Sequence, residues 1–134
     1  MESGVTGLPQ MDDITQSLQQ KILEAAKSGT SDRLLSIEIP KGDYAIQMLT
    51  VPKSVGVLLF SKDRVRLLYA GKRNRPMFVL EENSTLVLRE KIEIYYNTNN
   101  VQEVSNLMVR VPKSGRVDIP KEVKISLFSL KQEQ

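Results

Sequence analysis

Residues 55–70, VGVLLFSKDRVRLLYA, contain two short apolar runs separated by the polar residues Ser61-Lys62-Asp63-Arg64. Valine, leucine, phenylalanine and tyrosine favour strands, and a polar cluster between two such runs is typical of a turn that reverses the chain. We therefore predict a β-hairpin at the centre of the fold. Both faces of Val57-Leu58-Leu59-Phe60 are apolar, so this strand is expected to lie centrally or to carry a second contact surface.

Other short apolar runs follow one another from Leu34 onward, and some alternate apolar with polar residues, as Ile37, Glu38 and Ile39 do. Short alternating strands separated by turns are typical of a sandwich. Because no second helical pattern lies between them, βαβ units and a parallel sheet are not expected. We predict a mainly β fold, an antiparallel β-sandwich that is jelly-roll-like and preceded by one N-terminal amphipathic helix. Strands are expected near residues 34–39, 44–51, 55–60, 65–70, 77–80, 85–88, 92–97, 107–111 and 123–130.

The helix is predicted from Met11 to about Gly29. Apolar residues there recur at intervals of three and four, as on one helical face; they are Met11, Ile14, Leu18, Ile22 and Ala25. The opposite face carries Gln16, Gln19, Gln20 and Lys27. The chain is thus divided into an N-terminal arm and helix, residues 1–33, and a β-sandwich domain, residues 34–134. An isolated helix of this length is marginal in water. We expect it to cover its own sheet or to reach a neighbouring subunit through Ile14, Leu18 and Ile22.

The composition argues against catalysis. The chain has 134 residues, a net charge of +3, and no histidine, cysteine or tryptophan, so one domain is expected and catalytic triads and zinc sites are excluded. None of the seven glycines forms a phosphate-binding loop. We expect no enzyme, no cofactor and no metal. No apolar run approaches the roughly 20 residues that cross a bilayer, and the first residues lack a secretory pattern, so folding in the cytosol is expected.

Basic side chains gather between Lys62 and Arg75, where Asp63 is the single acid. The turn AGKRNRP, residues 70–76, carries three of them and can serve as a solvated turn, as a contact for an acidic protein surface, or as a contact for nucleic-acid phosphate. Candidate subunit contacts in this turn are Lys72, Arg73 and Arg75. Alternative nucleic-acid contacts are Lys62, Arg64, Arg66, Lys72, Arg73 and Arg75.

An apolar β-branched residue followed by Pro-Lys occurs four times, as Ile39-Pro40-Lys41, Val51-Pro52-Lys53, Val111-Pro112-Lys113 and Ile119-Pro120-Lys121. Proline cannot donate a ladder hydrogen bond, so each copy is expected to end or interrupt a strand, with its lysine in solvent. The alternative is that several of these lysines gather on one rim and contact an acidic partner.

The run IPKGDYAIQMLTVPKSVGVLLF, residues 39–60, followed by IYYNTNN at 94–100 and LMVRV at 107–111, resembles small β-sandwich virion proteins of tailed and tailless phages. The resemblance implies a capsid, decoration, neck or spike component. Such a component would be made in the host cytoplasm, reside in the virion, form homo-oligomers and contact other virion proteins.

Three functions are therefore considered. The first is a non-enzymatic structural or assembly protein that acts through subunit–subunit contacts and has no membrane span. The second is a small basic nucleic-acid-binding β-domain that uses the Lys62–Arg75 region. The third, a carbohydrate- or receptor-binding sandwich, requires a surface groove that contains Tyr95 or Tyr96.

Overall fold

The computed structural model describes residues 11–28 and 33–131, and short strands dominate this part of the chain. The elements are β1 (Asp12–Asp13), α1 (Thr15–Ser28), β2 (Leu34–Glu38), β3 (Gly42–Ile46), β4 (Leu49–Val51), β5 (Gly56–Phe60), β6 (Val65–Tyr69), β7 (Phe78–Leu80), β8 (Thr85–Leu88), β9 (Ile92–Asn97), the 3-10 helix η1 (Val101–Glu103), α2 (Val104–Met108), β10 (Val109–Arg110), β11 (Arg116–Asp118) and β12 (Ile125–Phe128). Every strand pairing in this part of the chain is parallel.

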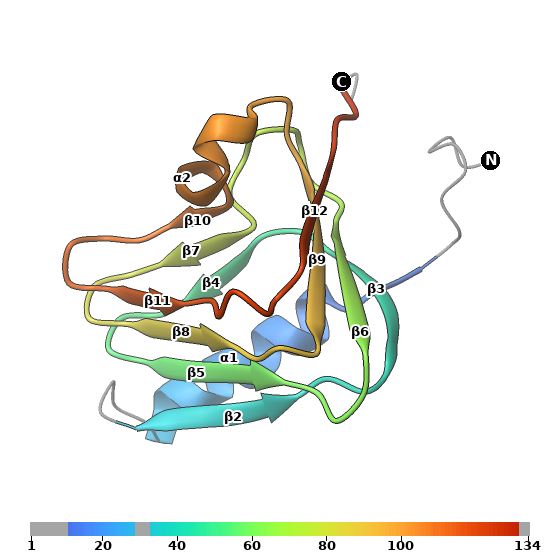
Figure 1. The fold of residues 1–134 in the computed structure, drawn as a ribbon. Helices are drawn as coiled ribbons and strands as arrows, with labels where there is room; N and C mark the ends of the chain where they lie inside the picture. Colours follow the sequence, from blue (N-terminus) through green and yellow to red (C-terminus); the bar gives the residue numbers. More distant parts are fainter. Residues whose placement is uncertain (1–10, 29–32, 132–134) are drawn as a thin grey trace.

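The strands form three sheets that the chain visits in a fixed order. Sheet I has the strand order β2-β5-β8-β11, sheet II β1-β3-β6-β9-β12, and sheet III β4-β7-β10. From β2 in sheet I the chain passes to β3 in sheet II and β4 in sheet III, and it then returns to sheet I at β5, beside β2. Each such circuit is one coil. The stacked coils make a three-sided parallel β-helix (Figure 1).

The predicted antiparallel, jelly-roll-like β-sandwich is therefore wrong. Parallel neighbours need a long connection that returns the chain to the same end of the sheet. Here the strands of the other two sheets provide that connection, so helices between strands are not needed. The predicted hairpin is wrong for the same reason, because β5 pairs with β2 and β8, whereas β6 pairs with β3 and β9. The residues between β5 and β6 turn a corner between two sheets. The central position expected for residues 57–60 is confirmed.

The core consists of inward rows of apolar side chains, with one residue from each coil. Side chains alternate along a strand, and these parallel strands are aligned, so an inward position in one coil lies beside an inward position in the next. Leu49, Phe78 and Val109 of sheet III form such a row and are all buried. In sheet II the rings of Tyr69 and Tyr96 stack with their centroids 5.3 Å apart. Burial of these rows is the main source of stability.

Three β-turns stack at the corner between sheets III and I. They span Pro52–Val55, Glu81–Ser84 and Pro112–Gly115, and in each the fourth N–H donates to the first carbonyl, at 3.2, 3.3 and 2.9 Å. Ser54 and Asn83 adopt positive φ values of 62° and 60°. Two Pro-Lys motifs fall in these turns, and the other two follow β2 and β11 at the corner between sheets I and II. The motifs therefore end strands, and their lysines are divided between two corners.

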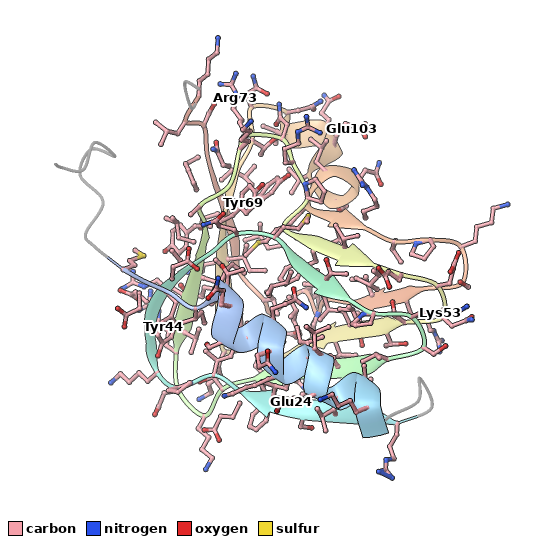
Figure 2. The ribbon with its side chains drawn as sticks, turned by 180° about the vertical axis from the view of Figure 1, so that it is seen from behind. Glu24, Tyr44, Lys53, Tyr69, Arg73 and Glu103 are labelled. Carbon is pink, nitrogen blue, oxygen red and sulfur yellow. The ribbon has the colours of Figure 1, made fainter. Side chains whose placement is uncertain are left out.

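One end of the β-helix is closed by α1 and β1. Figure 2 shows α1 lying across this end, and its side chains Leu18, Ile22 and Ala25 are buried in the core. Strand β1 pairs with the outer edge of β3. The side-chain amide of Gln19 donates to the Thr50 carbonyl at 2.8 Å and accepts from the Thr50 N–H at 2.9 Å. Gln19 thus occupies the edge of β4 as the peptide group of a neighbouring strand would.

The helix begins at Thr15, not at Met11 as predicted, because Asp12 and Asp13 are paired with β3. The Asp13 carboxylate accepts hydrogen bonds from the Thr15 N–H at 2.9 Å and from the Gln47 amide at 3.0 Å. Burial alone would raise the pKa of Asp13, but these hydrogen bonds outweigh burial and lower the pKa below its usual value. The predicted helix end, Gly29, lies outside the described residues.

Candidate interaction surface at the open end

The end of the β-helix opposite α1 has no covering element within residues 11–28 and 33–131. Sheets I and II end there with β11 and β12, whereas sheet III ends one coil earlier, with β10. Helix α2, inserted between β9 and β10, lies beside this step (Figure 1). The step contains a groove of about 480 Å³. Apolar side chains that line it include Met108, Val111, Val117, Ile119, Val123 and Ile125. We call this surface the open end.

Inward rows of the core finish at the open end in exposed side chains. Leu127 is aligned with Tyr96, which is 0% exposed, yet Leu127 itself is 39% exposed. Val111, directly after β10, is 44% exposed. The exposed fractions differ because Tyr96 has a coil on both sides, whereas Val111 and Leu127 have a neighbouring coil on one side only. Val111 also lines the groove, so its exposed side chain continues the apolar lining, and exposed apolar patches mark contact surfaces.

Strand β11 is the outermost strand of sheet I at the open end. The Arg116 N–H donates to the Ser84 carbonyl at 2.9 Å, toward β8. Backbone groups of successive residues in a strand point to opposite edges, so the N–H and C=O of Val117 point to the free edge. Arg116 and Asp118 are exposed, and the Val117 side chain lines the groove. The edge is short, because Pro120 follows soon after β11.

An asparagine side chain fixes the chain beyond β12. The Asn97 amide donates to the Leu130 carbonyl at 2.9 Å and accepts from the Leu130 N–H at 2.8 Å. This is the arrangement that Gln19 makes with Thr50 at the closed end. Asn97 is 1% exposed, so both bonds are shielded from water. The side chain of one coil therefore substitutes for backbone pairing in the next.

The loop after β6 is held against the end of β9. Asn74 has a φ of 65°, and its Oδ1 accepts a 2.6 Å hydrogen bond from the Thr98 hydroxyl. The Tyr96 hydroxyl donates to the Arg75 carbonyl at 2.6 Å. Burial, and less strongly the neighbouring Tyr69, raises the pKa of Tyr96 to about 12. The Tyr96 hydroxyl therefore remains a hydrogen-bond donor throughout the physiological pH range.

The three candidate contacts predicted on the helix lie against the chain's own core. Leu18 and Ile22 are 3% and 1% exposed, and Ile14 is partly buried and packs on the same core. The helix covers its own coil in this structure, so these side chains face the chain's own core. The sequence pattern alone could not distinguish the two arrangements, because both require the same apolar stripe.

The six predicted nucleic-acid contacts lie before, within and after β6, with Arg66 in the strand itself. Lys62 and Arg64 precede β6, whereas Lys72, Arg73 and Arg75 follow it, and the extended strand separates the two groups by roughly 16 Å. Two of the six side chains, Arg64 and Arg66, also form ion pairs, with Glu93 and Asp43 respectively, each at 2.9 Å. Hydrogen bonds to the Tyr95 hydroxyl and, less strongly, to Asp43 raise the pKa of Arg66. Two of the six charges are thus compensated locally.

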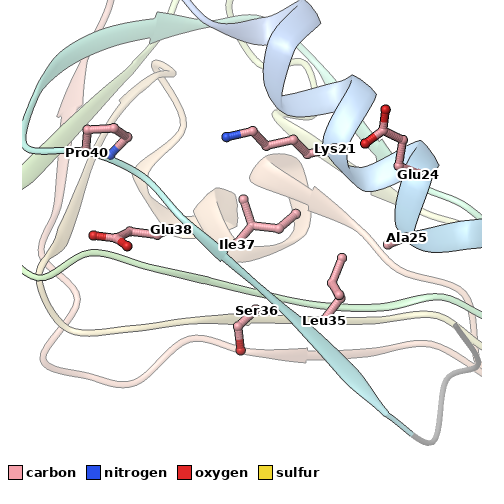
Figure 3. Close-up of a pocket in the computed structure, with 8 residues that line it drawn as sticks. All are labelled: Lys21, Glu24, Ala25, Leu35, Ser36, Ile37, Glu38 and Pro40. Carbon is pink, nitrogen blue, oxygen red and sulfur yellow. The ribbon is translucent and has the colours of Figure 1, made fainter. Parts of the chain in front are cut away.

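A second groove, of about 700 Å³, lies between α1 and β2 (Figure 3). Its lining includes Lys21 and Glu24 from α1, and Leu35 and Glu38 from β2. Within the described ranges, no group of three Asp or Glu side chains could hold a metal ion. No helix in these ranges combines the length and hydropathy needed to span a membrane.

Comparison with family models, with curated proteins and with solved structures finds no match for this chain. The strand topology therefore defines its class: a three-sided parallel β-helix, closed by a helix at one end and, within the described residues, open at the other. The open end was not predicted from the sequence, because its residues look like ordinary strand residues.

Proposed function

We propose that this protein is a non-enzymatic structural protein that acts through contacts between subunits, and that the open end carries the contact. One observation supports this proposal above all: at the open end the exposed side chain of Val111 lines an apolar groove, and Leu127 is exposed at the end of an inward row. At the closed end α1 covers the core and Gln19 occupies the edge of β4, and the exposed apolar residues there include Leu34 and Leu35 of β2. Removing apolar surface from water is the main driving force of protein association.

The resemblance to small β-sandwich virion proteins predicted a more specific role, that of a component of a virus particle. Since the fold is a β-helix, we propose the role in subunit contacts without assigning the protein to a virus particle. The virion role and the associated location stay predictions.

The alternative, binding of nucleic acid through residues 62–75, has less support. Its basic groups are divided between the two ends of β6, and Arg64 and Arg66 are paired with acids. Nucleic-acid binding depends on several cations that neutralise neighbouring phosphates together.

Sedimentation velocity on the full-length protein tests the proposal, with concentrations from about 1 μM to about 1 mM. We expect a reversible increase in mass above the 15.2 kDa of one chain. The same samples are passed over single- and double-stranded DNA at low salt. A monomer at every concentration would overturn the proposal. Salt-sensitive retention by DNA, together with a monomeric state, would support the alternative instead.

A further inference from the structure

We propose that the partner at the open end is a second copy of this chain, bound head to head, with β11 paired antiparallel to the partner's β11 about a two-fold axis at Val117. This inference rests on the proposed function and specifies the partner and the register. It follows from three features of β11: the direction of its free backbone groups, the order of its charges, and its position beside the groove.

The backbone of β11 fixes the register. The Arg116 N–H is used inside the sheet, by the Ser84 carbonyl at 2.9 Å. The N–H and C=O of Val117 therefore face outward, and a two-fold axis through this residue lets each Val117 exchange two hydrogen bonds with the same residue of the other copy. Since Pro120 prevents extension of the strand, few other registers satisfy these groups.

The charges of β11 fit the same register. Arg116 and Asp118 lie on either side of Val117 and on the same face of the sheet, and both are exposed. Antiparallel pairing about Val117 places Arg116 of each copy opposite Asp118 of the other. The strand Arg-Val-Asp is thus complementary to itself, as a two-fold interface requires. Parallel pairing in the same register would instead place like charges opposite each other.

The groove extends the contact inward from the strand edge. Val117 and Ile119 lead from β11 into the groove, and Ile125 lines its other side. In the two-fold arrangement the groove of one copy faces the groove of the other, so these apolar side chains leave water together. Sheet I then runs continuously from the β2 of one copy to the β2 of the other.

The self-complementary strand favours an assembly of two copies. A filament requires that opposite ends bind each other. At the closed end α1 covers the core and Gln19 occupies the edge of β4, and the free edge of β2 lacks the Arg-Val-Asp pattern of β11. The open ends therefore bind each other, and the resulting dimer is closed.

Two charge reversals in the full-length chain test this geometry. In Arg116→Asp every copy carries two acids on β11, and in Asp118→Arg every copy carries two bases. Each variant alone is expected to dimerise at least about tenfold more weakly than the wild type, since both cross-strand pairs become repulsive. An equimolar mixture of the two variants is expected to regain wild-type affinity as a 1:1 heterodimer, because all four charges are then opposite a charge of the other sign.

Matched controls are Arg89→Asp and Glu90→Arg, which make the same kind of charge reversal at exposed residues that follow β8. They are expected to dimerise as the wild type does. Circular dichroism and thermal unfolding confirm that each variant is folded. Sedimentation equilibrium gives the dissociation constants, and native mass spectrometry identifies the heterodimer in the mixture.

The outcomes separate the two proposals. Weakened single variants with recovery on mixing support the two-fold pairing. Wild-type association that neither reversal weakens, or single variants that do not recover on mixing, would overturn the pairing while leaving the proposed function intact. A monomeric wild type at all concentrations would overturn both. Formation of species larger than a dimer would contradict the closed, head-to-head arrangement.

Discussion

Replacing Gln19 by glutamate should convert the closed end of the β-helix into a pH-sensitive element. The Gln19 amide makes two hydrogen bonds to the backbone of Thr50, one as donor at 2.8 Å and one as acceptor at 2.9 Å. In the Gln19→Glu variant, the ionised carboxylate can still accept from the Thr50 N–H, but it cannot donate to the Thr50 carbonyl. A protonated carboxylic acid can do both, so the neutral form should restore the lost bond.

The expected magnitude follows from these two contacts. A lost neutral hydrogen bond costs about 1 kcal/mol, and a partly buried carbonyl left facing a carboxylate adds about 1 kcal/mol more. At pH 7 the Gln19→Glu variant should therefore be roughly 2 kcal/mol less stable than the wild type. Because the neutral carboxyl group restores the lost bond, folding raises the pKa of the introduced carboxyl group above its value in the unfolded chain. The stability of the variant relative to wild type is therefore greatest at acidic pH, below the unfolded pKa, and is lost as the pH rises through the raised folded-state pKa.

Urea unfolding of both proteins, followed by far-ultraviolet circular dichroism between about pH 4 and about pH 8, measures this difference. Gln16→Glu is the matched control, since the side chain of Gln16 is exposed on the same helix. It should change the free energy of unfolding by less than about 0.5 kcal/mol at every pH. A Gln19→Glu deficit that stays constant over this pH range, or that equals the Gln16→Glu effect, would refute the assignment of Gln19 as an edge cap.

Three further perturbations address the rest of the fold. Tyr96→Phe removes the hydrogen bond to the Arg75 carbonyl and should cost about 1 kcal/mol near neutral pH. Because the folded-state pKa of Tyr96 is raised to about 12, the stability that this hydroxyl contributes is complete below about pH 10 and is lost as the pH rises toward about 12. Alkaline conditions should therefore cost the wild type up to roughly 3 kcal/mol more stability than the variant. Identical dependence of stability on alkaline pH in the two proteins would contradict this. Asn97→Ala removes two buried hydrogen bonds to Leu130 and should cost about 2 kcal/mol of stability. Amide exchange should accelerate most beyond β12, and unchanged protection of the Leu130 amide would argue against the hydrogen bonds to Asn97. Gly71→Ala should cost about 1 to 3 kcal/mol in thermal unfolding, because a Cβ atom there would overlap the Tyr69 ring, and an unchanged melting temperature would show that the ring can move aside.

The positions of most strands could be predicted from local sequence, but their partners could not. The alternation of Ile37 and Ile39 with polar residues has the same period in a sandwich and in a β-helix, so it identifies strands without giving their direction. The available signal was the repeat of Val-Pro-Lys-Ser at residues 51–54 and 111–114. These copies lie two coils apart at the same corner, in turns with the same hydrogen bond. The insertion of α2 between β9 and β10 makes the coils unequal and hides the period.

The open end was beyond prediction for a different reason. Val111, Val117 and Ile125 are β-branched residues that would be buried in any coil with neighbours on both sides. Their exposure depends on the absence of a covering coil in the described residues, which is a property of the whole topology. Gln19 shows the converse, because helical spacing placed it on the solvent face, whereas tertiary structure brings it to the edge of β4.

Amide exchange of Val117, measured by NMR at low and at high protein concentration, reports on pairing at the edge of β11. We expect this amide, which faces the free edge of β11, to become protected as the protein concentration rises. Ser36 provides the comparison, since the Ile39 N–H donates to β5 and the Ser36 N–H therefore faces the free edge of β2 at the closed end. Its exchange should not depend on concentration. Protection of Ser36 with no change at Val117 would place the contact at the edge of β2 and would contradict a contact between open ends.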